Sequence, residues 1–243
     1  MANPNPGIRK RTVPMALVLL DGLAVAATAF ALVWVIFFTP REAVMGDVQK
    51  VFYFHVSAAW VGMLGFLLAF ISGIRFLRSR NADRDASGLA GVEIGFVFTL
   101  LAIVSGSIWA RPIWNTWWTW EPRLTTAFVM LLVYAAYFIL RSSVDEWEKK
   151  RRYSAIFAII AFASVPFTFI SIRLFRTIHP VLFGSGSGGD VFQMTPRMLF
   201  AFGLSLAAFT ILFTALYWHR CLLARDQENA RIEESRLQWE EEK

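Results

Sequence analysis

Six stretches of this chain are long and apolar enough to cross a lipid bilayer, and this feature limits its possible folds more than any other. They lie at about 14–38, 51–74, 88–110, 124–140, 153–172 and 197–218. A helix needs roughly 20 mainly apolar residues to span the hydrocarbon core, and only helices and closed barrels satisfy their backbone hydrogen bonds there. The sequence therefore predicts an all-α integral membrane protein of six transmembrane helices, formed by one domain over 1–243.

Composition agrees with this prediction. Hydrophobic residues make up 56% of the chain and charged residues 17%, too few charges for a soluble domain of 243 residues. The first stretch follows three basic residues, as a signal peptide does. Its apolar run is longer than a signal peptide's apolar core of about 7–15 residues, so we expect an uncleaved span.

The basic residues between the spans predict the orientation. Seventeen of the 24 Lys and Arg residues lie on the side that carries the amino terminus, the loops at 75–87 and 141–152, and the tail. The positive-inside rule then places both termini in the cytoplasm. The net charge of +6 is thus explained by topology, and we expect contact with membrane lipid and none with nucleic acid. The outer face consists of segments 39–50, 111–123 and 173–196.

The second outer segment is rich in tryptophan. Four indoles fall within seven residues, and Glu121 and Arg123 follow them; the indoles are Trp114, Trp117, Trp118 and Trp120. If the segment is helical, Trp114, Trp117, Trp118 and Glu121 share one face. One or two tryptophans are typical of an aromatic belt at the lipid headgroups. Four so close together, beside a charged pair, favour a short segment on which a large planar ligand stacks.

The three histidines are not equivalent. His55 lies about one turn inside the outer end of the second span, and His179 lies in the third outer segment. His219 lies at the cytoplasmic end of the sixth span, where an interfacial or structural role is expected. Neutral imidazoles from two separate segments suit the two axial positions of a haem iron. The single cysteine, Cys221, and the lack of a CxxCH motif exclude covalent haem attachment of the c-type.

Cations on the outer face fit the same ligand. Haem propionates need cationic partners, although each such residue can equally reach a lipid phosphate. Arg123 is the first choice because it directly follows the tryptophans. The other candidates are Lys50, Arg111, Arg173 and Arg176.

Several features leave alternatives open. Asp21 and Glu93 lie within spans, where carboxylates are functional candidates, but helix packing explains them equally well. The Gly/Ser run at 184–190 is either a connector or a means for the His179 segment to move. The charged tail at 220–243 is either a helix against a partner or a solvated end.

These motifs resemble one known family. The likeness is carried by Tyr53-Phe-His-Val-Ser-Ala-Ala-Trp60, by the stretch ending in Trp120-Glu-Pro-Arg-Leu-Thr125, and by His179. They are similar to the haem-handling cytochrome c maturation proteins with a tryptophan-rich WWD signature, the CcmC, CcmF and CcsA superfamily. The length and six spans match the CcmC type, haem exporter protein C, because CcmF and CcsA have more spans and additional histidines. The resemblance covers roughly 14–219.

The resemblance implies a function and a site. Such a protein lies in the bacterial cytoplasmic (inner) membrane and carries haem b as cargo at the outer face, without being an enzyme in the turnover sense. It passes haem to the chaperone CcmE and works with CcmA, CcmB and CcmD as an ATP-driven release complex. By position, His55 and His179 correspond to the axial ligands, the four tryptophans to the stacking segment, and Glu121 and Arg123 to the signature's acid and cation.

Three departures from the family pattern keep another function in view. Glu121 stands where the signature usually has Asp, Asn115 where Gly is common, and Ser57 where Pro is usual. They leave open a subunit of a CcsA-type cytochrome c synthase, against which the short chain argues. An electron-transferring b-type cytochrome would place paired histidines at matching depth inside the bundle. A haem-free permease is the remaining alternative.

Overall fold

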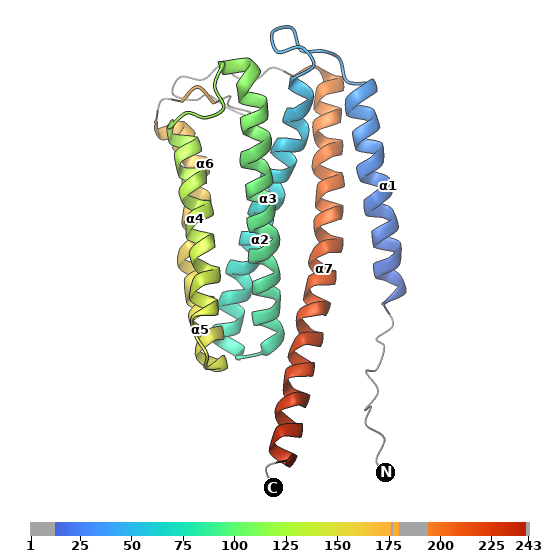
Figure 1. The fold of residues 1–243 in the computed structure, drawn as a ribbon. Coiled ribbons are helices and arrows are strands. Elements are labelled where there is room, and N and C mark those ends of the chain that lie inside the picture. Colours follow the sequence, from blue (N-terminus) through green and yellow to red (C-terminus); the bar gives the residue numbers. More distant parts are fainter. Residues whose placement is uncertain (1–12, 176, 180–193, 242–243) are drawn as a thin grey trace.

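Figure 1 shows the computed structural model of this protein, which describes residues 13–175, 177–179 and 194–241. The described residues form helices α1 (Met15–Phe37), α2 (Gln49–Ser79), α3 (Ala82–Trp114), α4 (Pro122–Ser142), α5 (Trp147–Ala161), α6 (Ser164–Leu174) and α7 (Pro196–Glu241). Six runs in this part of the chain are long and apolar enough to cross a membrane, the fifth being Trp147–Leu174. The all-helical fold with six such runs agrees with the sequence prediction.

Except for α1, the helical runs extend beyond the predicted spans. The largest difference is at α7, which continues to Glu241 without a break, so that the described part of the tail is helical. A helix of 46 residues is about 69 Å long. In Figure 1, α1 begins and α7 ends at the same end of the bundle, which we call the tail end. The opposite end, with residues 115–121, is the Trp-rich end. The Gly/Ser run at 184–190 lies outside the described residues.

The fifth crossing is divided between α5 and α6 because of Pro166. Proline has no backbone N–H, and its ring clashes with the carbonyl four residues earlier. That carbonyl belongs to Phe162, at the point where α5 ends and before α6 begins at Ser164. The break separates α6 as a short helix of its own, which ends just before the segment that carries His179.

Glycines allow α2 and α3 to pack closely. A Cβ atom added at Gly65 would lie 2.6 Å from the carbonyl oxygen of Gly91 and 2.7 Å from the backbone of Gly95. Small residues at such a contact let two membrane helices approach backbone to backbone. This contact fixes the register of α2 against α3, and thereby the place of His55 beside α3.

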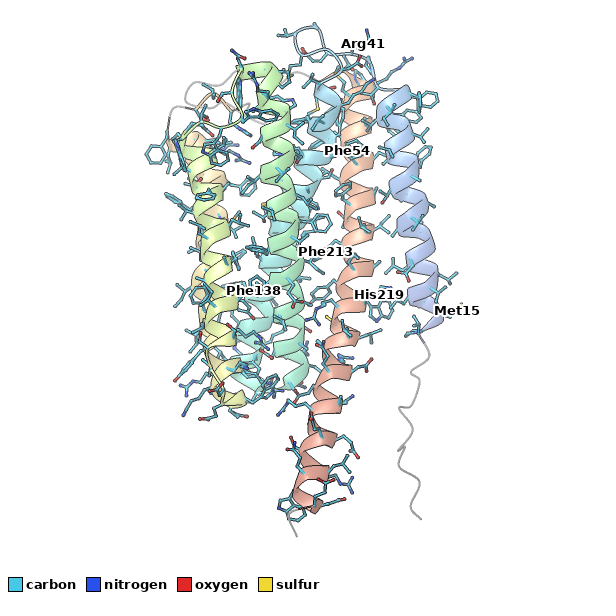
Figure 2. All side chains as sticks on the ribbon, viewed as in Figure 1. Met15, Arg41, Phe54, Phe138, Phe213 and His219 are labelled. Carbon is cyan, nitrogen blue, oxygen red and sulfur yellow. The ribbon has the colours of Figure 1, made fainter. Side chains whose placement is uncertain are left out.

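Helix α1 lies at the edge of the bundle, against α7 (Figures 1 and 2). His219 of α7 points toward α1, where its Nε2 lies 2.9 Å from each carboxylate oxygen of Asp21. In the next position of α7, Nη2 of Arg220 donates to Glu93 of α3 at 2.8 Å. The two acidic residues within spans therefore have helix-packing partners, as does His219.

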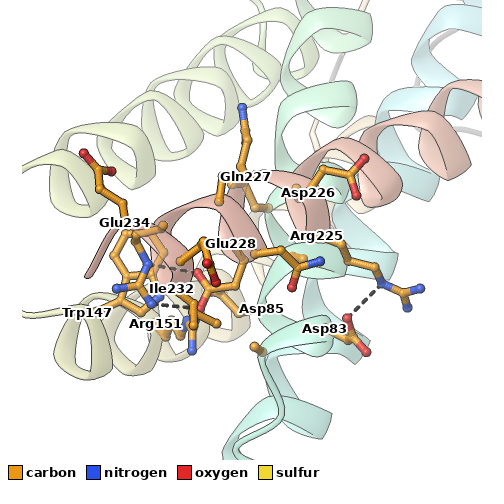
Figure 3. A pocket seen from close by; sticks show the side chains of 18 of the residues that line it. Asp83, Asp85, Trp147, Arg151, Arg225, Asp226, Gln227, Glu228, Ile232 and Glu234 are labelled. Atoms are coloured by element: carbon orange, nitrogen blue, oxygen red, sulfur yellow. Dashed lines mark hydrogen bonds and ion pairs between the residues drawn. The ribbon is translucent and has the colours of Figure 1, made fainter. Parts of the chain in front are cut away.

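Ion pairs brace the tail end. Arg141 of α4 binds Asp85 of α3 through two hydrogen bonds of 2.8 and 2.6 Å. The part of α7 beyond the apolar run borders an open groove at this end, and ion pairs reach across from it (Figure 3). Glu228 pairs with Arg151 of α5 at 2.6 Å, and Arg225 pairs with Asp83 at 2.8 Å. These contacts hold the extension of α7 against the bundle.

Candidate functional site

The part of the Trp-rich segment that joins α3 to α4, residues 115–121, is not helical. Helix α3 ends at Trp114, and Asn115 follows with a left-handed backbone, φ 54°. Among residues other than glycine, asparagine adopts this conformation most readily, which explains physically why Asn115 can replace the usual glycine. Residues 115–121 then run as an irregular segment up to the start of α4. The shared helical face that a continuous helix would give to Trp117 and Glu121 is therefore not formed.

His55 is held against α3 by one ring nitrogen. Its Nδ1 lies 2.9 Å from the carbonyl oxygen of Ala102 and 3.4 Å from Oγ of Ser105. A carbonyl only accepts, so Nδ1 carries the proton and Nε2 keeps its lone pair. The ring also lies against Gly106, where an added Cβ would come within 2.8 Å of its Cε1 atom. His55 is thus oriented as the histidine ligands of metals usually are, with its other nitrogen hydrogen-bonded to a carbonyl.

His179 lies on the segment after α6. Its backbone N–H donates to Oγ1 of Thr177 at 3.0 Å, and its ring centroid lies 6.0 Å from that of Trp114. Nδ1 is buried and has no hydrogen-bond partner among the described residues. Burial, then the charge of Arg123, and then His55 hold the pKa of His179 well below its ordinary value. The ring is therefore neutral at physiological pH.

Arg123 lies in the first turn of α4. Its guanidinium carbon is 4.9 Å from the ring centroid of Phe169 in α6. Its Nη1 is buried without a hydrogen-bond partner in the part of the chain that the structure describes. A buried donor of a charged group carries a desolvation cost until an acceptor reaches it. Nη1 of Arg123 is thus a cationic hydrogen-bond donor for which the described residues supply no acceptor.

These side chains converge on one cavity of about 90 Å³ between α2, α3, α4 and α6. Its lining includes His55, His179, Arg123, Trp114 and Trp118, together with further aromatic and hydroxyl side chains and apolar ones such as Met63 and Met130. At about 30 Å³ for each water molecule, the cavity has room for a few waters. A larger ligand enters only if the lining side chains move apart.

The other predicted site residues lie outside this lining. Trp117 and Trp120 are 58% and 71% exposed, and Trp120 contacts Trp118 edge to face. Lys50 pairs with Asp47 at 2.8 Å and donates to the carbonyl of Ile36 at 2.9 Å. The carboxylate of Glu121 binds the start of α4 and Thr177. The structure thus brings together both histidines, Arg123 and two of the four tryptophans.

Sequence reasoning did not identify three residues that shape the site. Gly106 makes room for the His55 ring, Phe169 packs on Arg123, and Thr177 binds both Glu121 and the backbone of His179. The small residues at 105–107 are the only sequence signal for the first. The other two depend on contacts between distant segments, which no local pattern reports.

Comparison with known proteins shows the family to which the chain belongs. Residues 2–236 match the family model described as Heme exporter protein C. The chain belongs to this family. Curated proteins of the same name are similar to it over most of its length. The protein of Bradyrhizobium diazoefficiens is 30% identical over 181 residues, which cover 73% of this chain and 67% of that protein.

Two further relatives agree. Heme exporter protein C of Paracoccus denitrificans is 27% identical over 194 residues, 79% of either chain. That of Escherichia coli K12 is 28% identical over 179 residues, 74% of this chain and 73% of the relative. The family is one of multi-span membrane proteins of cytochrome c biogenesis, and its name describes a transport component and not an enzyme.

Proposed function

We propose that this protein binds haem at the outer face of the cytoplasmic membrane and delivers it to a haem chaperone during c-type cytochrome maturation. The observation that carries the proposal is the convergence of His55 and His179, from α2 and the segment after α6, on one cavity that also holds Arg123. Two neutral imidazoles from separate segments suit the opposite axial positions of a porphyrin iron.

The metal-binding side chains of the described residues suit an iron that is already held by a porphyrin. Among the described residues, no group of three or more His, Cys, Asp and Glu side chains is placed to hold a bare metal ion. Two histidines fill only the axial positions, and a porphyrin supplies the four equatorial nitrogens itself. Because Nδ1 of His55 is bound to the carbonyl of Ala102, its Nε2 keeps a lone pair that could coordinate the iron.

The chemistry of the remaining lining suits the rest of a haem, once the side chains move apart to admit it. Trp114 and Trp118 would offer flat apolar faces to a planar ring, and Met63 and Met130 would add apolar surface. Arg123 would offer a guanidinium donor to a propionate, in a charge-assisted hydrogen bond. The deep placement of Arg123 makes it a better propionate partner than Lys50, whose ammonium group is already paired with Asp47.

The location and partners follow from charge and family. We infer that the Trp-rich end is the outer face, because most of the basic residues outside the spans lie toward the tail end. CcmE is then the acceptor of the haem, and CcmA, CcmB and CcmD form the ATP-driven complex that releases it. Membership of the Heme exporter protein C family supports partners of the Ccm system.

The absorbance spectrum of the purified protein tests the proposal. We expect a Soret band with the features of a bis-histidine iron, reduced in His55→Ala and His179→Ala and lost in the double variant. His219→Ala is the control, because His219 pairs with Asp21 at the other end of the bundle, and it should leave the band unchanged. A wild-type protein that takes up no haem, or a double variant that binds it fully, contradicts the proposal.

A further inference from the structure

We infer that Glu121 is a positioning residue for the proposed ligand His179, acting through the hydroxyl of Thr177. The inference rests on the proposed function in treating His179 as a haem ligand. Glu121 acts outside the cavity, because its carboxylate binds the start of α4 and the segment after α6. One side chain thereby joins the elements that carry Arg123 and His179.

One oxygen of Glu121 caps helix α4. Oε1 accepts the backbone N–H of Leu124 at 2.9 Å, and Glu121 is the residue at which the helix begins. The first N–H groups of a helix lack partners within it, and a side-chain acceptor satisfies one of them. Pro122 takes the first helical position, where its missing N–H is no loss. This cap fixes the first turn of α4, which carries Arg123.

The other oxygen binds the segment of His179. Oε2 accepts the hydroxyl proton of Thr177, and the same hydroxyl oxygen accepts the backbone N–H of His179 at 3.0 Å. Thr177 is 7% exposed, so water does not readily replace these bonds. A chain of two hydrogen bonds therefore connects the start of α4 to the backbone of His179, and it fixes where the imidazole stands.

The length of the side chain matters for this double contact. An aspartate, one methylene shorter, is a good helix cap by itself. If its first oxygen still reaches the N–H of Leu124, its second oxygen is drawn back from Thr177. Glutamate at this position therefore permits the cap and the contact with Thr177 together, which gives a physical sense to the departure from the usual acid.

The main test measures the coordination of the iron. Thr177→Val has nearly the shape of threonine, leaves the cap of α4 intact and removes the hydroxyl that joins Glu121 to His179. We expect its haem to shift from a six-coordinate low-spin spectrum toward a five-coordinate high-spin one, because His55 remains and His179 does not reach the iron. Added imidazole should restore the low-spin spectrum, and Thr177→Ser, which keeps the hydroxyl, should resemble the wild type.

A second measurement needs no haem. A nitroxide label on Ile178→Cys, in a Cys221→Ser background, reports the motion of this segment, since Ile178 is 52% exposed. We expect Thr177→Val and Glu121→Asp each to narrow its spectral lines at least two-fold, as the label becomes more mobile. A label on Val44→Cys, on a separate segment, is the matched control and should not change.

The outcomes separate the two ideas. Low-spin haem in Thr177→Val together with an unchanged label at position 178 overturns the positioning role. A wild type that binds no haem overturns the proposed function, while the label spectra still decide whether Glu121 and Thr177 hold the segment. Mobile labels in both variants, with a low-spin to high-spin shift in Thr177→Val, establish the positioning role.

Discussion

At the scale of single residues, the site depends on how the His55 ring is held. The carbonyl of Ala102 fixes its tautomer at 2.9 Å, and Gly106 leaves the space that the ring occupies. We expect Gly106→Ala to displace the ring, because the new Cβ would lie 2.8 Å from Cε1. Overpacking of this kind costs about 1–3 kcal/mol, so haem retention should fall about five-fold or more, measured by the Soret absorbance per protein.

The matched control for this change is Gly203→Ala. Gly203 is also a helical glycine, and a Cβ there would meet no atom within 4 Å. Its variant should retain haem like the wild type. Equal retention by the two alanine variants would show that the space beside His55 is unimportant.

Arg123 should have opposite effects on stability and on binding. Its buried Nη1 lacks a partner among the described residues. A buried charged donor without a partner carries a desolvation cost that an apolar side chain of similar length does not. We therefore expect Arg123→Met to match or exceed the wild type in thermal stability without haem. With haem bound, Arg123→Met should be less stable than the wild type, because the variant lacks a charge-assisted hydrogen bond worth about 1.5–3 kcal/mol. Thermal unfolding of both forms checks this.

The lowered pKa of His179 predicts a pH dependence of the haem-free protein. An ordinary histidine has a pKa of about 6.5, and His179 is held below that value. The unfolded chain then binds a proton first as the pH falls, so stability is complete above about pH 6.5 and declines below it, until the folded pKa is reached. Thermal unfolding between pH 8 and 5 should show a smaller decline for His179→Ala than for the wild type.

The sequence indicated five candidate site residues of distinctive chemistry, which the structure brings to one cavity. His55, His179, Arg123, Trp114 and Trp118 could be placed together because their types are unusual in an apolar chain and topology puts them on one face. The contacts that support these residues could not be predicted from the sequence. Gly106 and Thr177 are ordinary residue types, and they matter because the fold places them against distant segments. The helical face considered for the Trp-rich segment is not formed, because a left-handed Asn115 ends the helix there.

At the scale of elements, hydropathy predicted where each helix crosses the apolar layer but not where it ends. Helix ends depend on caps, such as Glu121 for α4, and on polar residues that continue a helix into water, as in α7. Hydropathy also did not predict the break before α6. Pro166 lies within an uninterrupted apolar run, which is predicted as one span. Fold class is thus the more predictable property.

The close contact between α2 and α3 at Gly65 predicts how a larger residue there affects stability. A Cβ at Gly65 would meet backbone atoms of α3 at 2.6 Å, and backbone cannot move aside as a flexible side chain can. We expect Gly65→Ala to force the helices apart and to lower the thermal stability by about 1–3 kcal/mol. His55 should then lose its contact with Ala102, so the haem spectrum should change as well. An alanine at Gly22, which has no neighbouring atom within 4 Å, should leave both measurements unchanged.

At the scale of the whole molecule, ion pairs tie the extension of α7 to the bundle. Arg151 and Glu228 are 11% and 16% exposed and lie 2.6 Å apart, so their coupling should exceed that of a surface pair. A double-mutant cycle of Arg151→Ala and Glu228→Ala should give an interaction of about 0.5–3 kcal/mol. Each single variant should speed tryptic cleavage at Arg231 or Arg236. Cleavage at the wild-type rate in both would mean that these pairs do not hold the extension.

The unbroken length of α7 makes it a lever between the two ends of the protein. Near its start, Met198 and Phe202 pack with Trp109, whose ring lies 5.2 Å from that of Trp114 in the cavity wall. If a rod of about 69 Å tilts by about 5° around its middle, each end is displaced by about 3 Å. Such a tilt, started by a push on the extension, would press on the wall of the cavity that His55 and His179 line.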